Sequence, residues 1–231
     1  MSIPKIIHQT WKDENIPQHF QRYADTWKQM HTDWQYILWT DEMNRDYIAT
    51  NFPCFLEIYD QYANAIQRVD AVRYFILYKM GGVFIDLDFK CLKNIESLLD
   101  ERENIFGFEP EEHCLLHAKD MIISNAFMAS IPQSSFIKEV CKELSMNKPE
   151  SMHPFDYILE TTGPFMLTRV YKGYKNKSDV VLLDDKIMYP LTKSEIKKMN
   201  DNDETIRLKM ERAYGIHYYA GTWWKKSRNK K

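Results

Sequence analysis

Two aspartates, Asp86 and Asp88, directly follow the apolar run 83–85 and are separated by one residue. In extended backbone, side chains two residues apart point to the same side, so both carboxylates are expected to face one site. Their repulsion makes ionisation of both costly unless a divalent cation lies between them. Oxygen ligands of this kind suit Mg²⁺ or Mn²⁺, which also bind phosphate oxygens. The pair predicts a metal and diphosphate site, and the alternative is a solvated acidic turn.

A carboxylate and a guanidinium lie on an otherwise apolar helical stripe upstream. Helical spacing places four residues on this face, namely Ile66, Asp70, Arg73 and Leu77. One interpretation is an internal ion pair supported by Arg68. The other is that the face borders the cleft, where Asp70 would accept hydrogen bonds from sugar hydroxyls and Arg73 would approach the sugar or the diphosphate.

A third group of candidates lies in the segment 217–223. His217 is a candidate third metal ligand, because imidazole binds Mn²⁺. Gly221 would let a loop move over the donor, and Thr222 and Trp223 would then touch phosphate and sugar. The alternative is a core histidine followed by an exposed aromatic tail.

Strands and helices alternate along the sequence and predict an α/β fold. Strands are expected at residues 5–10, 35–39, 83–85, 105–108, 121–124, 180–183 and 215–219. Helices are expected at residues 17–30, 41–51, 63–79, 134–146, 165–174 and 194–210. The helix 63–79 is apolar nearly all round and should be buried on several sides. We expect one domain built on a mainly parallel central sheet flanked by helices, without internal repeats.

The composition excludes several classes of protein. Acidic and basic residues nearly balance, with a net charge of −2, so the charge does not indicate a nucleic acid partner. The four cysteines lack the close spacing of a zinc site and are expected to be buried thiols in a reducing compartment. No stretch is long enough for a membrane span, and the first residues do not form a signal peptide. We therefore expect a cytoplasmic protein.

Three segments together resemble glycosyltransferase family thirty-two. The segment 3–11, Ile-Pro-Lys-Ile-Ile-His-Gln-Thr-Trp, is similar to the opening motif of that family. The segments 68–74 and 81–88 are similar to its core signature, which contains the DxD motif. Weaker matches lie at residues 124–127, 162–164 and 217–223. The family includes initiating α-1,6-mannosyltransferases and capsular polysaccharide enzymes, and the large clostridial glucosylating toxins share a more distant version.

The resemblance implies a GT-A fold in one unit, with a Rossmann-like nucleotide-sugar half at about 1–100 and an acceptor half at about 101–224. A basic tail would follow at 225–231. It also implies a retaining glycosyltransferase that depends on Mn²⁺ or Mg²⁺. The donor would be a nucleotide diphosphate sugar, with a UDP-sugar favoured over a GDP-sugar. The acceptor would be a glycan or a lipid-linked glycan, and surface polysaccharide assembly is the expected setting.

Carried over by position, the resemblance assigns residues to the nucleotide and the sugar. Trp11 would stack near the base, and Gln9 would line the same pocket. Asp70 and Arg73 would contact the donor sugar. Asn125 would lie near the entry of the acceptor, which makes these last three the candidate catalytic residues.

The resemblance also assigns residues to the metal and the diphosphate. Asp88 would be a direct metal ligand, and His217 would complete the metal shell. Asp86 would hold the ribose and, directly or through water, the metal. Thr222 keeps the hydroxyl that many members supply from serine for a phosphate contact, and Trp223 would contact the donor.

Two rival functions and one partner stay open at this point. A DxD phosphohydrolase would use its first aspartate as a nucleophile, but Lys90 stands where such enzymes need a small hydroxylated or apolar residue. A catalytically inactive glycan-binding module is the second rival. The aromatic and basic residues of 223–231 suggest a peripheral membrane contact at the inner face of the membrane, and the alternative is a solvated tail.

Overall fold

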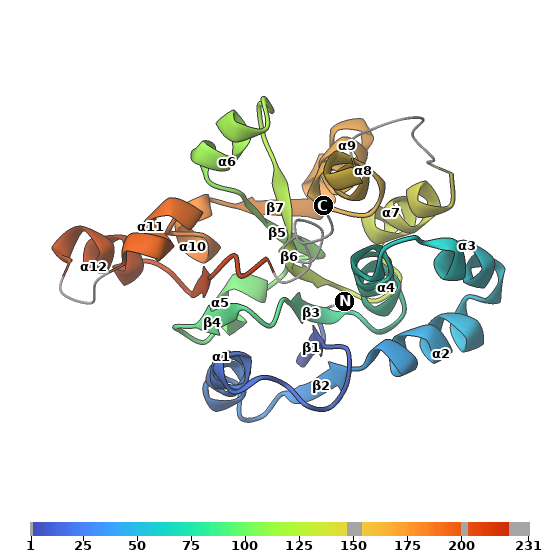
Figure 1. The fold of residues 1–231 in the computed structure, drawn as a ribbon, viewed down its shortest axis with the longest axis horizontal. Helices are drawn as coiled ribbons and strands as arrows, with labels where there is room; N and C mark the ends of the chain where they lie inside the picture. Colours follow the sequence, from blue (N-terminus) through green and yellow to red (C-terminus); the bar gives the residue numbers. More distant parts are fainter. Residues whose placement is uncertain (1, 147–153, 200–202, 222–231) are drawn as a thin grey trace, which may run out of the picture.

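A central β-sheet forms the middle of the protein (Figure 1). The computed structural model describes residues 2–146, 154–199 and 203–221. The predictions for Thr222, Trp223 and the tail 225–231 lie outside these residues. The described strands are β1 (Ile6–Thr10), β2 (Gln35–Trp39), β3 (Gly82–Ile85), β4 (Phe89–Cys91), β5 (Asn104–Phe108), β6 (Ile123–Ser130), β7 (Val180–Leu183) and β8 (Gly215–His217).

Helices surround the sheet and fill most of its connections (Figure 1). They are α1 (Gln18–Met30), α2 (Asp41–Asn51), α3 (Leu56–Gln61), α4 (Ala65–Met80), α5 (Glu96–Leu99), α6 (Glu111–Leu116), α7 (Ser135–Met146), α8 (Pro154–Thr161), α9 (Pro164–Gly173), α10 (Asp185–Met188), α11 (Lys193–Lys198) and α12 (Glu204–Glu211). Short 3₁₀ turns occupy Pro53–Phe55 and Lys177–Asp179. Within the described ranges, no helix combines the length and the apolar character needed to cross a bilayer.

The main sheet has the strand order β2-β1-β3-β6-β5-β7. β1 pairs in parallel with β2 and β3, β5 pairs in parallel with β7, and β6 is antiparallel to both of its neighbours. The prediction of an α/β fold on a mainly parallel sheet is therefore confirmed. Because all strands except β6 run in one direction, the carboxyl ends of β1, β2, β3 and β5 meet at one edge, where open α/β sheets bind ligands.

Both faces of the sheet are covered, so its central strands are apolar on both sides. Phe84 of β3 joins the larger core cluster with residues of α4 and α7, whereas Val83 and Ile85 join a second cluster with Trp27 of α1. This alternation follows the two-residue period of a strand. Three of the cysteines are buried free thiols, but Cys54 is exposed, so the expectation that all four are buried was wrong.

Helix α4 connects to β3 through two glycines. Asn64 caps the helix in a capping box with Gln67, and nine of its residues are buried, which confirms the predicted buried helix. Gly81 and Gly82 have φ angles of +66° and +95°, in the region that favours glycine. A Cβ atom on Gly82 would lie 2.7 Å from the Ile6 carbonyl oxygen. Glycine is therefore needed here for β3 to approach β1.

Three predicted elements differ clearly from the structure, and the first two are a strand and a helix. The strand expected at 121–124 is the eight-residue β6, which continues through Ser124, Asn125 and Ala126. These small and polar residues interrupt the apolar run that signals a buried strand. The helix expected at 194–210 is two helices, because α11 ends before Met199 and Asp203 caps α12 by accepting hydrogen bonds from two backbone N–H groups.

The last predicted strand, 215–219, ends at His217. β8 pairs with β4 in a separate two-stranded sheet and is not part of the main sheet. Tyr219 has a φ angle of +48°, which breaks the extended backbone. The turn directs the following residues back toward Asp88, whose carboxylate accepts a hydrogen bond from the Ala220 N–H at 2.8 Å.

His8, in the opening motif, is fully buried between β2 and the α4–β3 turn. Its Nδ1 accepts a hydrogen bond from the Trp39 indole at 3.2 Å, and its Nε2–H donates to the Gly81 carbonyl at 3.0 Å. The ring is thus held neutral, and burial lowers its pKa from 6.5 to about 4.

Acid is therefore expected to destabilise the protein through His8. Because the pKa is lower in the folded than in the unfolded state, the stabilisation is present above pH 6.5 and is lost as the pH falls toward 4. The free energy of unfolding should fall by about 3 kcal/mol between pH 7 and pH 4. Urea denaturation at pH 7 and pH 4 measures this fall in the free energy of unfolding. In His8→Gln the difference between the two pH values should be much smaller. An equally large difference in His8→Gln would contradict the assignment.

Candidate active site

The DxD motif follows β3 directly at the carboxyl edge of the sheet. Asp86 and Asp88 lie in a turn rather than in extended backbone, since the Phe89 N–H donates to the Asp86 carbonyl at 3.1 Å. The expectation of an extended DxD segment was wrong, because the chain must turn here to begin β4. Leu87 is buried against Phe20, which anchors the turn on α1. Both carboxylates nevertheless face one site.

The two carboxylates meet His217 from β8. One ligand atom from each of Asp86, Asp88 and His217 lies within 4.8 Å of the others, and among the described residues this is the one such group. All three side chains are partly buried. Two carboxylate oxygens and an imidazole nitrogen fit Mn²⁺, and fit Mg²⁺ less closely. The structure therefore brings together the three predicted metal ligands.

His217 is positioned by the pairing of β8 with β4. In this register it lies opposite Phe89, and the two rings stack with centroids 5.3 Å apart. The His217 Nε2 lies 3.1 Å from the Asp88 Oδ1. Burial lowers the pKa of His217, but the charge and the hydrogen bond of Asp88 outweigh it and raise the pKa. The same contact outweighs burial at Asp88 and holds its pKa below the usual value.

Arg73 of α4 connects the acidic residues on the other side of the site. It is 2% exposed, and its guanidinium lies 3.0 Å from Asp70 Oδ1 and 3.1 Å from Asp86 Oδ1. It also donates to the Asn125 carbonyl at 2.7 Å. The internal ion pair is confirmed, without the expected support from Arg68, which donates to the Tyr62 carbonyl, and the contact of Asp70 and Arg73 with the sugar or the diphosphate stays a prediction.

Asp70 is the most enclosed carboxylate of this group. Its Oδ1 accepts a hydrogen bond from the Asn125 amide at 3.1 Å, and its Oδ2 accepts one from the Thr162 hydroxyl at 3.4 Å. Burial raises its pKa to about 7, although the charge of Arg73 opposes the rise. Thr162 was not among the predicted site residues, and only the weak resemblance at 162–164 pointed to it. We name Asp70, Arg73, Asp86 and Asn125 the Arg73 cluster.

Gln9 and Trp11 lie at the carboxyl end of β1. The Gln9 amide is fully buried, donates to the Asp86 carbonyl at 3.2 Å and accepts from the Tyr36 hydroxyl at 2.9 Å. Gln9 thus fixes the backbone of the DxD turn. The Trp11 ring packs at 5.3 Å from Phe20, and its buried Nε1–H has no hydrogen-bond partner within the described part of the chain.

A partly buried Glu–His pair after β5 escaped the sequence analysis. Glu109 follows β5 at the same sheet edge, and its Oε2 lies 2.8 Å from the His113 Nδ1. Burial raises the pKa of Glu109, but the hydrogen bond of His113 outweighs it and lowers the pKa. The Tyr219 ring lies between His113 and His217, with centroids 4.8 and 4.3 Å away. The i, i+4 spacing of Glu109 and His113 was the available signal.

Comparison with known proteins adds two close sequence relatives. Residues 17–105 match the family described as glycosyltransferase sugar-binding region containing DXD motif. Inositol phosphoceramide mannosyltransferase 2 of Schizosaccharomyces pombe is 36% identical over 175 residues, which are 76% of this chain and 48% of the relative. Mannosyl phosphorylinositol ceramide synthase SUR1 of Saccharomyces cerevisiae is 38% identical over 173 residues, 75% of this chain and 43% of the relative. The chain spans about half the length of these relatives.

A solved structure shares the fold. The structure titled PaToxG Glycosyltransferase aligns with a TM-score of 0.58 over 74% of this chain and 70% of that chain, with 17% sequence identity. At this identity the likeness concerns the arrangement of strands and helices alone.

Proposed function

The chain belongs to the glycosyltransferase family with a DXD sugar-binding region, its fold is of the GT-A type, and we propose that it transfers a hexose from a nucleoside diphosphate sugar to a glycan or glycolipid acceptor. The proposal depends on one observation. His217 is distant in sequence from Asp86 and Asp88, yet the three residues present ligand atoms within 4.8 Å of one another, directly beside the buried Arg73.

The residues of the site divide into two groups with different tasks. Asp86, Asp88 and His217 would hold Mn²⁺, or Mg²⁺ in its place. When bound, the metal neutralises the negative charge that develops on the leaving diphosphate. In the Arg73 cluster, the guanidinium fixes Asp86 and Asp70, and Asp70 accepts hydrogen bonds from hydroxyls of the donor sugar. Asn125 holds the Asp70 carboxylate in place.

The names of the relatives support a mannosyl donor and a glycolipid acceptor. One relative is named a mannosyltransferase of inositol phosphoceramide, and the other a mannosyl phosphorylinositol ceramide synthase. We therefore propose that a mannosyl group is transferred to a hydroxyl of a glycolipid headgroup, in preference to a growing surface polysaccharide. The expected preference for UDP over GDP stays a prediction.

The sugar is expected to keep its anomeric configuration. The bond between the anomeric carbon and the diphosphate oxygen breaks, and the acceptor hydroxyl forms its bond on the same face. A diphosphate oxygen accepts the proton of that hydroxyl. The described site residues offer no free carboxylate nucleophile, because Asp70 and Asp86 are both bound by Arg73. Proton NMR of the initial product measures the configuration, and an inverted anomeric centre would exclude this mechanism.

A thermal-shift panel of GDP-mannose, UDP-glucose and UDP-galactose, each with and without Mn²⁺, tests donor binding. A ligand at 100 times its dissociation constant stabilises the folded state by about 2.7 kcal/mol, or roughly 5–10 °C for a chain of this size. We expect one nucleotide sugar to reach this shift, and only with Mn²⁺ present. No Mn²⁺-dependent shift with any of the three would contradict the proposed function.

A further inference from the structure

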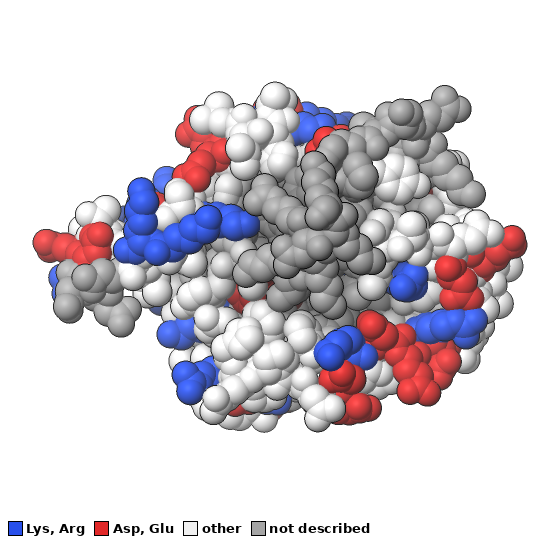
Figure 2. Space-filling model, in the orientation of Figure 1, with Lys and Arg blue, Asp and Glu red and all other residues white. Residues whose placement is uncertain are grey.

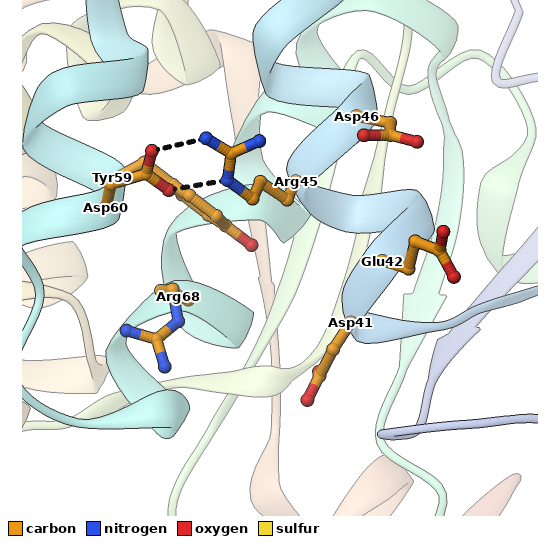
Figure 3. A pocket seen from close by; sticks show the side chains of 7 residues that line it. All are labelled: Asp41, Glu42, Arg45, Asp46, Tyr59, Asp60 and Arg68. Atoms are coloured by element: carbon orange, nitrogen blue, oxygen red, sulfur yellow. Dashed lines mark hydrogen bonds and ion pairs between the residues drawn. The ribbon is translucent and has the colours of Figure 1, made fainter.

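A second hollow lies away from the metal ligands, between α2, α3 and the first turn of α4. Its volume is about 730 Å³, and its lining is polar (Figure 3). Figure 2 shows charged side chains of both signs gathered over α2 and α3 at the lower right of that view. We call it the α2–α3 hollow, and it is lined by Asp41, Glu42, Arg45, Asp46, Tyr59, Asp60 and Arg68.

The hollow carries an excess of negative charge. Four carboxylates face two guanidiniums in its lining. Arg45 is already bound to Asp60 by two hydrogen bonds of 2.9 and 2.7 Å, and Arg68 donates to the Tyr62 carbonyl at 2.7 Å. In the described part of the chain, the carboxylates of Asp41, Glu42 and Asp46 make no hydrogen bond or ion pair. The lining therefore offers free hydrogen-bond acceptors and disfavours an anion.

Tyr59 adds a donor that no described residue uses. Its side chain is 2% exposed, and its hydroxyl points into the hollow between Arg45, Arg68 and Asp41 (Figure 3). No hydrogen bond joins that hydroxyl to another residue of the described ranges. Burial raises the pKa of Tyr59, so the hydroxyl stays protonated. The hydroxyl is therefore accessible from the hollow and can donate a hydrogen bond to a ligand oxygen there.

Two walls of the hollow are continuous in sequence with elements of the donor site. α4 packs on β3 and leads into it through a tight glycine turn, so the first turn of the helix lies at the carboxyl edge of the sheet. Arg68 precedes Arg73 by five residues, about 7.5 Å along the helix axis and about 140° around it, so the two arginines lie on different sides of the first turns of α4. On the other side, the Asp41 N–H donates to the Lys12 carbonyl at 3.3 Å, in the loop that follows Trp11. Both walls of the hollow thus continue elements of the donor site.

We propose that the α2–α3 hollow binds a neutral polyhydroxylated ring of the acceptor, a sugar or a cyclitol, next to the donor sugar. Carboxylates accept hydrogen bonds from ring hydroxyls, and Tyr59 and Arg68 donate to ring oxygens. The volume lies within the usual range for small-molecule sites. The inference rests on the proposed function, because a ring bound here is an acceptor only if the neighbouring site holds a sugar donor.

Saturation-transfer NMR on the full chain, with diamagnetic Mg²⁺ and nucleoside diphosphate present, tests the proposal. The probes are myo-inositol and methyl α-mannopyranoside at millimolar concentration. Tyr59→Phe removes only the hydroxyl and should lower the affinity for the bound probe by roughly 3- to 10-fold. Tyr47→Phe is the matched control, since the Tyr47 hydroxyl is also without a partner among the described residues but lies outside the hollow. Asp41→Asn is a second test variant, and Glu57→Gln, at an exposed position outside the hollow, is its matched control.

Weaker probe binding in Tyr59→Phe and Asp41→Asn, with wild-type binding in both controls, would support the proposal. No saturation transfer to either probe, or equal affinities in Tyr59→Phe and Tyr47→Phe, would overturn it. The Mn²⁺-dependent thermal shift with nucleotide sugar reports on the donor site separately. If that shift is present while the polyol results are negative, the acceptor site is wrong and the donor function stands.

Discussion

Replacing Asp88 with asparagine is expected to abolish the Mn²⁺-dependent part of nucleotide-sugar binding and to lower transfer about 10³-fold. Asparagine keeps the shape but loses the charge, and its NH₂ group cannot accept one of the two hydrogen bonds that His217 and Ala220 now make with the carboxylate. The metal then lacks an anionic ligand at the position where charge on the diphosphate must be neutralised. Thermal shift with and without Mn²⁺ measures the binding, and a coupled assay measures transfer.

Exposed Asp100 provides the matched control for this experiment. Asp100→Asn removes the same charge from the chain and should leave both the Mn²⁺-dependent shift and the transfer rate at wild-type values. The unliganded Asp88→Asn protein should still fold, as circular dichroism can verify. A full Mn²⁺-dependent shift in Asp88→Asn would show that this carboxylate does not hold the metal.

The largest effect on stability is expected from Arg73→Met. Arg73 is buried, contacts two carboxylates and lies over the Phe84 ring, 4.7 Å from its centroid. Methionine fills much of the space but leaves Asp70 and Asp86 without their cation. Removing one partner of a buried ion pair costs about 3–5 kcal/mol. For a chain of this size the melting temperature should fall by roughly 6–20 °C.

Arg45→Met tests whether burial causes this loss. Arg45 is also bound to an aspartate, Asp60, but both side chains are largely exposed. An exposed pair of this kind is worth less than about 1 kcal/mol, so Arg45→Met should melt near the wild type. Asp70→Asn introduced into Arg73→Met should recover part of the lost stability. Equal losses of melting temperature in Arg73→Met and Arg45→Met would refute the claim that burial makes the Arg73 ion pairs important for stability.

Local patterns in the sequence were sufficient for much of this site. The acidic pair after an apolar strand pointed to Asp86 and Asp88, and the charged residues on an apolar helix pointed to Asp70 and Arg73 as either an internal ion pair or part of the cleft. The structure brings the four residues together. Each pattern depends on the spacing of neighbouring residues, which fixes the side from which a side chain emerges. The predicted extended DxD backbone was wrong because the pairing of β4 with β8 forces a turn there.

Contacts between distant segments were harder to predict from the sequence. The contact of His217 with Asp88 was expected from a family resemblance, and no local spacing indicates it. The hydrogen bond from Thr162 to Asp70 and the approach of Tyr219 to His113 likewise depend on how separate elements pack. The α2–α3 hollow is the clearest case, since Tyr59 belongs to no motif and Arg68, although part of the segment 68–74, was not expected to line a separate hollow with it. Their common orientation results from the packing of α2, α3 and α4.

The bond between His217 and Asp88 joins residues that are 129 positions apart. Synthesis on the ribosome proceeds from the N-terminus, and domains generally fold in that order. A nascent chain can therefore form the sheet strands that carry Asp86 long before His217 has emerged from the exit tunnel. His217 is available only when synthesis of β8 is complete, so the unfinished polypeptide cannot bring the three residues of the candidate metal site together.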